Sequence, residues 1–238
     1  MKTITVLLCD DHDIVRQGLR ALLEVAGDML VIGEAENGHQ AVRETKRLQP
    51  EVVVMDLAMP LLNGVEAARQ IAHQAPDVRV LILSSYNDDE HLHSAVEAGA
   101  AGYLMKESAG DELLAAVRET HNGGAFFSPH MLKRMLKKRF QRAPDDVAPT
   151  ENVRLTYRQG EVLQLIAEGY ASKQIAAVLS VSVKTIEKHR QGLMNTLDIH
   201  NIASLTRYAI SRGVIESNLS PIGQSGQTGE ARILKNAS

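Results

Sequence analysis

The sequence predicts an α/β protein: a doubly wound, five-stranded parallel sheet followed by a small all-α domain. One observation, with a general rule of chain topology, predicts the sheet. Five short apolar runs alternate with amphipathic segments over residues 4–128, and strands that alternate with helices pair in parallel through right-handed crossovers. A second observation predicts the second domain: the pattern is wholly helical from Leu155 onward.

The strands are predicted from apolar runs that turn residues bound. These runs cover residues 5–9, 30–34, 52–55, 80–83 and 102–105. Helices are predicted after them, because apolar residues recur there at three- and four-residue spacing. The residues expected to face the core are Ile14, Leu19, Leu22 and Leu23 in the first helix, Val65, Ala68 and Ala72 in the third, and Leu113, Leu114 and Val117 in the fifth.

The first domain is predicted to span residues 1–128, and residues 129–152 are predicted to link it to the second. The linker begins with a basic segment whose apolar residues recur at helical spacing, which predicts a solvated helix packed by one face. These residues are Met131, Leu132, Met135, Leu136 and Phe140. The stretch "APDDVAPTEN" that follows is proline-rich, acidic and without periodicity, as expected of a tether.

The second domain is predicted to span residues 153–216 and to hold four helices. Thr156 and Gln159 have the spacing of a capping box at the first helix, and Gly169 ends it. Ser172 begins a short second helix, and Ser182 caps a third over residues 183–197. A fourth covers residues 203–211. The polar, turn-rich residues 217–238 are expected to be disordered.

Length and composition limit the class of protein. At 238 residues and 44% apolar content, the chain can bury two cores. The one cysteine, Cys9, allows no disulfide within the chain and is expected to be a small buried apolar residue. No stretch approaches the ~20 apolar residues of a membrane span, and "MKTITVLLCDD" is better interpreted as a first strand than as a signal segment. A soluble, cytoplasmic protein with no membrane partner is expected.

The net charge of −3 hides an asymmetry between the two halves. Residues 1–128 carry 10 Lys/Arg against 20 Asp/Glu, whereas residues 129–215 carry 14 against 7. An acidic half joined to a basic half indicates a different partner for each, with nucleic acid a candidate for the basic half.

Polar residues follow the predicted strands of the first half, at the edge where an open parallel sheet binds its ligands. Asp10 and Asp11 follow the first strand, Asp56 the third, Ser84 the fourth and Lys106 the fifth. Clustered carboxylates suit a hard cation such as Mg²⁺, and a lysine and a hydroxyl can bind further oxyanions. Since a carboxylate can itself be a nucleophile, we predict that Asp56 is phosphorylated.

The stretches "LLCDDHDIVRQGLRALL", "VVVMDLAMPLLNG", "LILSS" and "AGAAGYLMKES" resemble the receiver domain of bacterial two-component response regulators, a flavodoxin-like fold. The resemblance implies that Asp56 is the phosphoacceptor and that Mg²⁺ is bound by Asp10, Asp11, Asp56 and the carbonyl of Ala58. It also implies that Lys106 pairs with the phosphoryl group, that Ser84 moves toward it and that Tyr103 repacks. Four histidines lack the spacing of metal ligands and are expected on the surface: His12, His39, His91 and His93.

The short second helix, the turn and the longer third helix of the second half form a predicted helix-turn-helix, whose second helix would enter the major groove. Ile186, Leu193 and Leu197 should face inward. The side chains expected to read bases are Lys184, Glu187, Lys188, Gln191 and Asn195. Those placed to contact phosphates are Lys173, Thr185, His189 and Arg190.

Residues 150–215, and above all "LTYRQGEVLQLIAEGYASKQIAAVLSVSVKTIEKHRQGLMNTL", resemble the LuxR-type (NarL/FixJ) DNA-binding domain. The match includes Ser182, Thr185 and His189. It departs at Gln159 and Gly160, at Asp198, and at Thr196, where the family usually has a phosphate-contacting lysine.

Together these features predict a non-enzymatic, phosphorylation-switched transcription factor. Its expected partners are a sensor histidine kinase, double-stranded DNA and, after phosphorylation, a second copy of the chain, with RNA polymerase a further candidate. One alternative is a receiver whose helical half is a protein-docking module. Another is a phosphatase of the haloacid-dehalogenase type, but that class normally needs a second acid where Ala58 lies.

Overall fold

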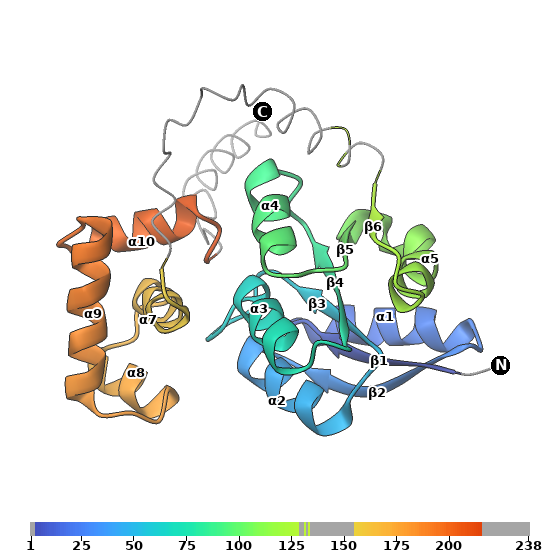
Figure 1. Cartoon of the computed structure of the whole chain (residues 1–238), viewed down its shortest axis with the longest axis horizontal. Helices are drawn as coiled ribbons and strands as arrows, with labels where there is room; N and C mark the ends of the chain where they lie inside the picture. The colour runs from blue at the N-terminus through green and yellow to red at the C-terminus, as the bar shows by residue number, and fades with distance from the viewer. Residues whose placement is uncertain (1–2, 129–130, 132, 134–154, 216–238) are drawn as a thin grey trace, which may run out of the picture.

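The computed structural model describes residues 3–128, 131, 133 and 155–215, which form a sheet domain and a helical domain side by side (Figure 1). The sheet has the order β2-β1-β3-β4-β5-β6, and all neighbouring strands are parallel. The predicted doubly wound parallel sheet is therefore confirmed. Its strands are β1 (Ile4–Cys9), β2 (Met29–Ala35), β3 (Val52–Asp56), β4 (Arg79–Ser84), β5 (Gly102–Met105) and β6 (Phe126–Phe127).

The sixth strand was not predicted. β6 adds to the sheet edge, where Phe126 pairs with Gly102 and Phe127 with Tyr103. A strand of two residues shows no alternation of apolar and polar positions, so periodicity could not reveal it.

Helices cover both faces of the sheet. α1 and α5 pack on one face, and α2, α3 and α4 on the other (Figure 1). Each face has its own apolar core, and β3, buried along its whole length, contributes alternate residues to both. The helices are α1 (Asp13–Val25), α2 (Gly38–Leu48), α3 (Gly64–Gln74), α4 (Asp89–Glu97) and α5 (Ala109–His121), with a 3₁₀ turn η1 (Lys106–Ser108) before α5.

The prediction of which α1 residues face the core was partly wrong. Leu19 and Leu23 are buried as expected, but the side chains of Ile14 and Leu22 are exposed, Ile14 by 77%. Arg16 takes the inner position instead and is only 5% exposed. Because Arg16 lies three residues before Leu19, it shares the helical face that meets the sheet. Acidic side chains around its guanidinium explain why a cation is tolerated there.

The helical domain holds α7 (Tyr157–Ala167), α8 (Ser172–Val178), α9 (Val183–Leu197) and α10 (Ile202–Ser211). The capping box of Thr156 and Gln159 is confirmed, and the Ser182 hydroxyl caps α9 by accepting the Thr185 amide proton. Gly169 follows α7 with a φ of +90°, a conformation that favours glycine. Sequence signals at the helix ends therefore located these helices closely.

The core of the helical domain is formed by one face of each helix. Ile186 and Leu193 of α9 are buried in it as predicted, and Leu197 packs at its border. Of the predicted linker, only Met131 and Lys133 are described, and Met131 packs into the core of the sheet domain. The remaining linker and the tail 217–238 lie outside the described residues. Among the residues that the structure describes, no helix is long and apolar enough to cross a membrane.

Candidate functional site

The carboxyl ends of β1, β3 and β5 bring two acids and a lysine together. Asp10 and Asp56 are 1% and 4% exposed. The Lys106 Nζ lies 2.7 Å from Oδ2 of Asp10 and 3.0 Å from Oδ2 of Asp56. One ammonium group thus holds two carboxylates from different strands, at the edge where the sequence placed them.

Burial and neighbouring charges set the protonation of this cluster. Burial raises the pKa of Asp56 to about 6; the charge of Lys106 opposes the rise and that of Asp10 adds to it. Burial on its own would lower the pKa of Lys106, but the charges of Asp56 and Asp10 outweigh it and the pKa is raised. Near neutral pH Asp56 is therefore largely ionised, as a nucleophilic carboxylate must be.

The donor atoms fit a hard divalent cation. Asp10, Asp11 and His12 each offer a ligand atom, and these atoms lie within 4.8 Å of one another. Asp56 is not among these three residues, but its carboxylate, like those of Asp10 and Asp11, is of the oxygen type that Mg²⁺ prefers. Ala58, whose carbonyl was the fourth predicted ligand, lies in the loop after β3 and is partly exposed. His12 is exposed as predicted, but its Nδ1 lies 2.9 Å from the Asp11 carboxylate, a contact the sequence did not reveal.

Ser84 and Tyr103 both contact the main chain of Tyr86. Ser84 is buried, and its hydroxyl oxygen accepts the Tyr86 amide proton at 3.0 Å. The Tyr103 ring is buried, and its hydroxyl donates to the Tyr86 carbonyl at 2.7 Å. These two predicted switch residues therefore contact the same loop, the one between β4 and α4.

The loop after Asp56 is hydrogen-bonded to the helical domain. The amides of Leu61 and Asn63 donate to the carboxylate of Glu168 (3.1 Å) and to the Gln164 side-chain oxygen (2.8 Å). The Gln164 side-chain nitrogen donates in turn to the Met59 carbonyl at 2.9 Å. The Leu61 side chain packs against the core of the helical domain. The segment that follows the predicted phosphoacceptor is thus also part of the domain contact.

A second contact joins α4 to the end of α10. Arg212 forms an ion pair with Glu90, and the His91 ring lies against Gly213. The same imidazole stacks on Tyr86 with the ring centroids 4.3 Å apart. His91 is therefore not the surface residue that was predicted: only 12% of its side chain is exposed.

His39, in contrast to the exposed His93, is also partly covered. Burial lowers the pKa of His39, whose neighbouring charges are Glu161 and Arg158 of the helical domain. Histidines buried by contact between domains cannot be distinguished from surface histidines in the sequence, because no local pattern marks the contact.

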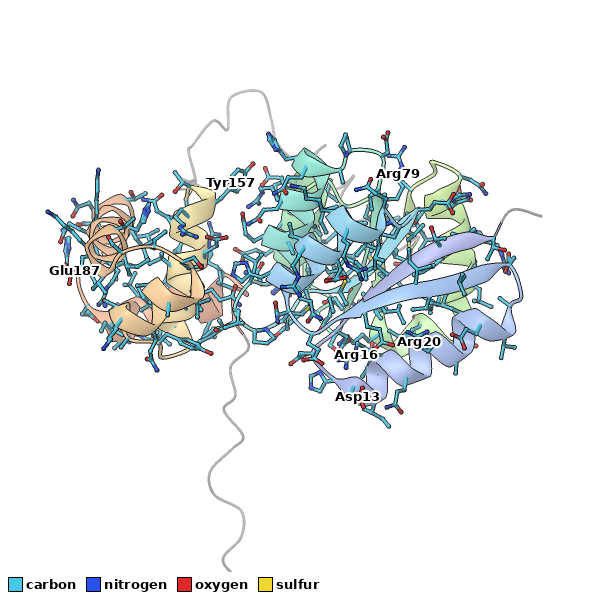
Figure 2. The ribbon with its side chains drawn as sticks, turned by 90° about the horizontal axis from the view of Figure 1, so that it is seen from below. Asp13, Arg16, Arg20, Arg79, Tyr157 and Glu187 are labelled. Carbon is cyan, nitrogen blue, oxygen red and sulfur yellow. The ribbon has the colours of Figure 1, made fainter. Side chains whose placement is uncertain are left out.

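The predicted DNA-reading side of α9 faces away from the sheet domain. Glu187 marks this side at the outer edge of the helical domain (Figure 2). The predicted base-contacting residues, exposed along α9, are Lys184, Glu187, Lys188, Gln191 and Asn195. Among the predicted phosphate contacts, Lys173 is exposed, Thr185 and His189 are partly exposed, and Arg190 donates to the Ser172 hydroxyl at 2.7 Å.

Two departures from the family pattern contact each other. The Gln159 side-chain nitrogen donates to the Thr196 hydroxyl at 3.3 Å and so links the start of α7 to the end of α9. Gly160 has open space where a side chain would be. Asp198 ends α9 in the left-handed conformation, with a φ of +52°. Sequence comparison showed these positions as separate departures, and only the fold brings Gln159 and Thr196 together.

Family models match both halves of the chain. A response regulator receiver domain matches residues 6–118, and the luxR family of bacterial regulatory proteins matches residues 153–209. The transcriptional regulatory protein LiaR of Bacillus subtilis is 37% identical over 206 residues, which cover 87% of this chain and 96% of LiaR. The response regulator VraR of Staphylococcus aureus is 33% identical over 214 residues, covering 90% of this chain and all of VraR.

Solved structures agree with these relatives. The response regulator RcsB of Salmonella typhimurium is 27% identical with a TM-score of 0.59, over 89% of this chain and 99% of that one. A structure of an RcsB–DNA complex is 28% identical with a TM-score of 0.53, over 88% and 99% of the two chains. This chain belongs to the two-component response regulators that join a receiver domain to a LuxR-type DNA-binding domain and act as transcriptional regulators rather than as enzymes.

Proposed function

We propose that Asp56 accepts a phosphoryl group from a sensor histidine kinase, and that this modification controls DNA binding through the helical domain. The observation that carries the proposal is the contact of one ammonium group, on Lys106, with the buried carboxylates of Asp10 and Asp56. A strand end fixes Asp56, and Lys106 is within reach of any anion formed on it.

The residues support a direct transfer. A carboxylate oxygen of Asp56 would attack phosphorus as the bond to the donor's imidazole nitrogen breaks, and that nitrogen keeps the bonding electron pair. The three carboxylates of Asp10, Asp11 and Asp56, with the carbonyl of Ala58, would hold Mg²⁺, which neutralises charge on phosphoryl oxygens when bound. Lys106 would then shift from pairing with Asp56 to pairing with the phosphoryl group, and Ser84 would donate a hydrogen bond to it.

The test is incorporation of phosphate from a small phosphodonor, followed by intact mass. Wild type with Mg²⁺ should gain one phosphoryl group, and Asp56→Asn should gain none. Asp77→Asn, which alters an exposed acid, is the matched control and should be modified like wild type. The assignment fails if Asp56→Asn is still modified, or if a chelator leaves the wild-type reaction unchanged.

Phosphorylation is proposed to act by forming a homodimer that binds two half-sites on DNA. The exposed side chains of α9 support this mechanism over its rival, in which the receiver covers the recognition helix until it is phosphorylated. α9 also offers few cations, namely Lys184, Lys188 and Arg190, and these are opposed by Glu187. A single domain with so few phosphate contacts should bind DNA in the non-specific range, roughly micromolar or weaker.

The two mechanisms differ in what they predict for a fragment of residues 150–216. If dimerisation is the switch, this fragment should bind DNA no better than the unphosphorylated full-length chain. Much tighter binding by the fragment would indicate that the receiver occludes α9. Binding to neither cognate nor random DNA, even by the phosphorylated full-length chain, would favour a protein-docking role for the helical domain.

A further inference from the structure

Arg16 is a buried cation directly beside the predicted phosphorylation site. It comes from the inner face of α1, where the neighbouring core positions are Leu19 and Leu23. An arginine in a core needs partners for all of its donors, because an unpaired buried charge is costly. The hydrogen-bond partners of Arg16 therefore show which segments it holds together.

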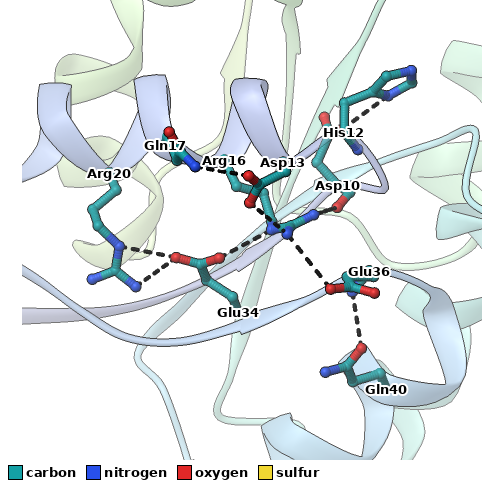
Figure 3. Close-up of polar contacts among 9 residues, drawn as sticks. All are labelled: Asp10, His12, Asp13, Arg16, Gln17, Arg20, Glu34, Glu36 and Gln40. Atoms are coloured by element: carbon teal, nitrogen blue, oxygen red, sulfur yellow. Dashed lines mark hydrogen bonds and ion pairs between the residues drawn. The ribbon is translucent and has the colours of Figure 1, made fainter.

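The guanidinium of Arg16 binds three different segments (Figure 3). Nη1 donates to the main-chain carbonyl of Asp10 at 2.8 Å, in a fully buried hydrogen bond. Nε donates to Glu34 on β2 at 3.0 Å, and Nη2 to Asp13 at 3.0 Å. Glu36 lies 3.6 Å from Nη2. The planar donor array thus ties the end of β1 to the end of β2 and to the first turn of α1.

Asp10 is contacted at its amide, at its carbonyl and at both carboxylate oxygens. Its amide donates to the Ala35 carbonyl at 3.1 Å, and its carbonyl accepts from Arg16. Its carboxylate accepts the His12 amide proton at 2.8 Å through Oδ1 and faces Lys106 through Oδ2. The carboxylate of Asp10 must stay close to other carboxylates that repel it. A fixed main chain keeps it from rotating out of the site.

A purely structural role for Arg16 is the competing explanation. Buried ion pairs are often replaceable by apolar residues without loss of stability, so the pairing with Glu34 does not by itself require an arginine. Arg20 makes the distinction testable. It binds the same Glu34 carboxylate, at 2.9 Å from Nε, but its hydrogen bonds reach Glu24 and Val31, and none reaches Asp10.

We propose that Arg16 is a positioning residue for the phosphorylation site, which acts by fixing the main chain of Asp10 so that its carboxylate faces the metal and Lys106. This inference rests on the proposed function of Asp56. Arg16 contacts neither the predicted acceptor nor the phosphoryl group, so its loss should weaken metal binding more than the chemistry of the metal-loaded protein.

The experiment measures Mg²⁺ binding by calorimetry on the unphosphorylated full-length chain. Arg16→Met should raise the dissociation constant about tenfold, in the range seen when a partner of a metal ligand is removed. Arg16→Lys keeps the charge but loses the planar donor array, and should raise the dissociation constant about threefold. Arg20→Met, the control, should stay within about twofold of wild type.

A second readout separates positioning from general damage. At saturating Mg²⁺, the rate of Asp56 modification in Arg16→Met should recover to within about threefold of wild type, while at low Mg²⁺ it should fall with the metal affinity. Thermal unfolding midpoints of Arg16→Met and Arg20→Met provide the measure of stability. If Arg16→Met does not fold, the decision rests on Arg16→Lys.

Three results would overturn the inference. They are equal losses of Mg²⁺ affinity in the Arg16 and Arg20 variants, an unchanged Mg²⁺ affinity in folded Arg16→Met, or an Arg16→Lys variant that binds Mg²⁺ like wild type. Failure of the proposed function is distinguishable, because wild type would then bind Mg²⁺ with the predicted dependence on Arg16 and still not be phosphorylated at Asp56.

Discussion

The proposed phosphorylation site of the receiver and the proposed DNA-facing side of α9 are built in opposite ways. In the receiver, Asp10, Asp56 and Lys106 are in contact before any phosphoryl group arrives. Along α9, Lys188 and Gln191 point into solvent. The first region is assembled and enclosed, and the second is open and sparsely charged. The proposed mechanism follows from this difference: phosphorylation has little to uncover on α9, and the gain in DNA affinity is expected from joining two such surfaces.

The difference follows from the two folds. Parallel strands bring their carboxyl ends to one edge, so side chains far apart in sequence meet in a buried site. A recognition helix inserts into a groove, so its reading side chains lie on the surface of its domain rather than in a buried site. The receiver should consequently be sensitive to changes of shape and charge that the helical domain tolerates.

Gly64→Ala should have the largest effect on stability. A β-carbon on Gly64, the first residue of α3, would overlap the main-chain oxygen of Asp56. Because the obstacle is main chain, the segment after Asp56 must shift to relieve the overlap, and we expect a loss of about 3 kcal/mol in the free energy of unfolding. Denaturant unfolding measures it. A loss below about 1 kcal/mol, with unchanged phosphorylation, would show that this loop is not held tightly.

Glu66→Gln should change how the stability of the receiver depends on pH. Burial raises the pKa of the Glu66 carboxyl from 4.5 to about 7, with Arg69 opposing the rise. Because the folded pKa lies above the unfolded one, wild type should lose stability as pH rises from about 4.5 to about 7. Glu66→Gln should remove roughly 2–3 kcal/mol of that loss.

Denaturant unfolding at a series of pH values tests the Glu66 prediction. Glu187→Gln is the matched control on the exposed helix, and should alter the free energy of unfolding by no more than about 0.5 kcal/mol. If wild type and Glu66→Gln lose stability in parallel across this pH range, the carboxyl of Glu66 is not the group responsible.

Alanine variants on the helical domain should separate base contacts from phosphate contacts. Lys188→Ala and Gln191→Ala should each cost about 1–3 kcal/mol on the cognate site and relax its sequence preference. Lys173→Ala and Arg190→Ala should weaken binding to all sequences alike and lower the salt slope by about one. Titrations on cognate and random DNA at several salt concentrations measure both. Equal losses on both DNAs for all four variants would indicate non-specific binding only.

Gly160→Ala should have the smallest effect and the opposite sign to Gly64→Ala. Gly160 lies within α7, and a β-carbon there would meet nothing within 4 Å. Alanine favours a helix interior by about 1 kcal/mol over glycine, so the variant should be more stable by up to that amount. Unfolding of the full-length chain measures it, and a loss of stability would show that Gly160 has a role the contacts do not explain.

Much of the receiver site could be predicted from the sequence, because β-strand runs show where strands end and parallel order shows that those ends meet. Asp10, Asp56 and Lys106 were found this way. The buried position of Arg16 and the hydrogen bonds of Gln164 could not be predicted. Neither helical periodicity nor composition shows which polar side chain will meet a distant main-chain group. The same limit hid the covered position of His91.

The most direct test of the central claim compares two DNAs, with binding sites first selected from genomic DNA by the phosphorylated protein. One DNA carries both half-sites, and in the other one half-site is scrambled. Phosphorylation of the full-length chain should raise affinity for the intact site by about 10²–10⁴ and leave affinity for the single half-site nearly unchanged, because the gain comes from linking two domains. An equal gain on both DNAs would contradict the account, since it would show that phosphorylation uncovers each DNA-binding domain separately.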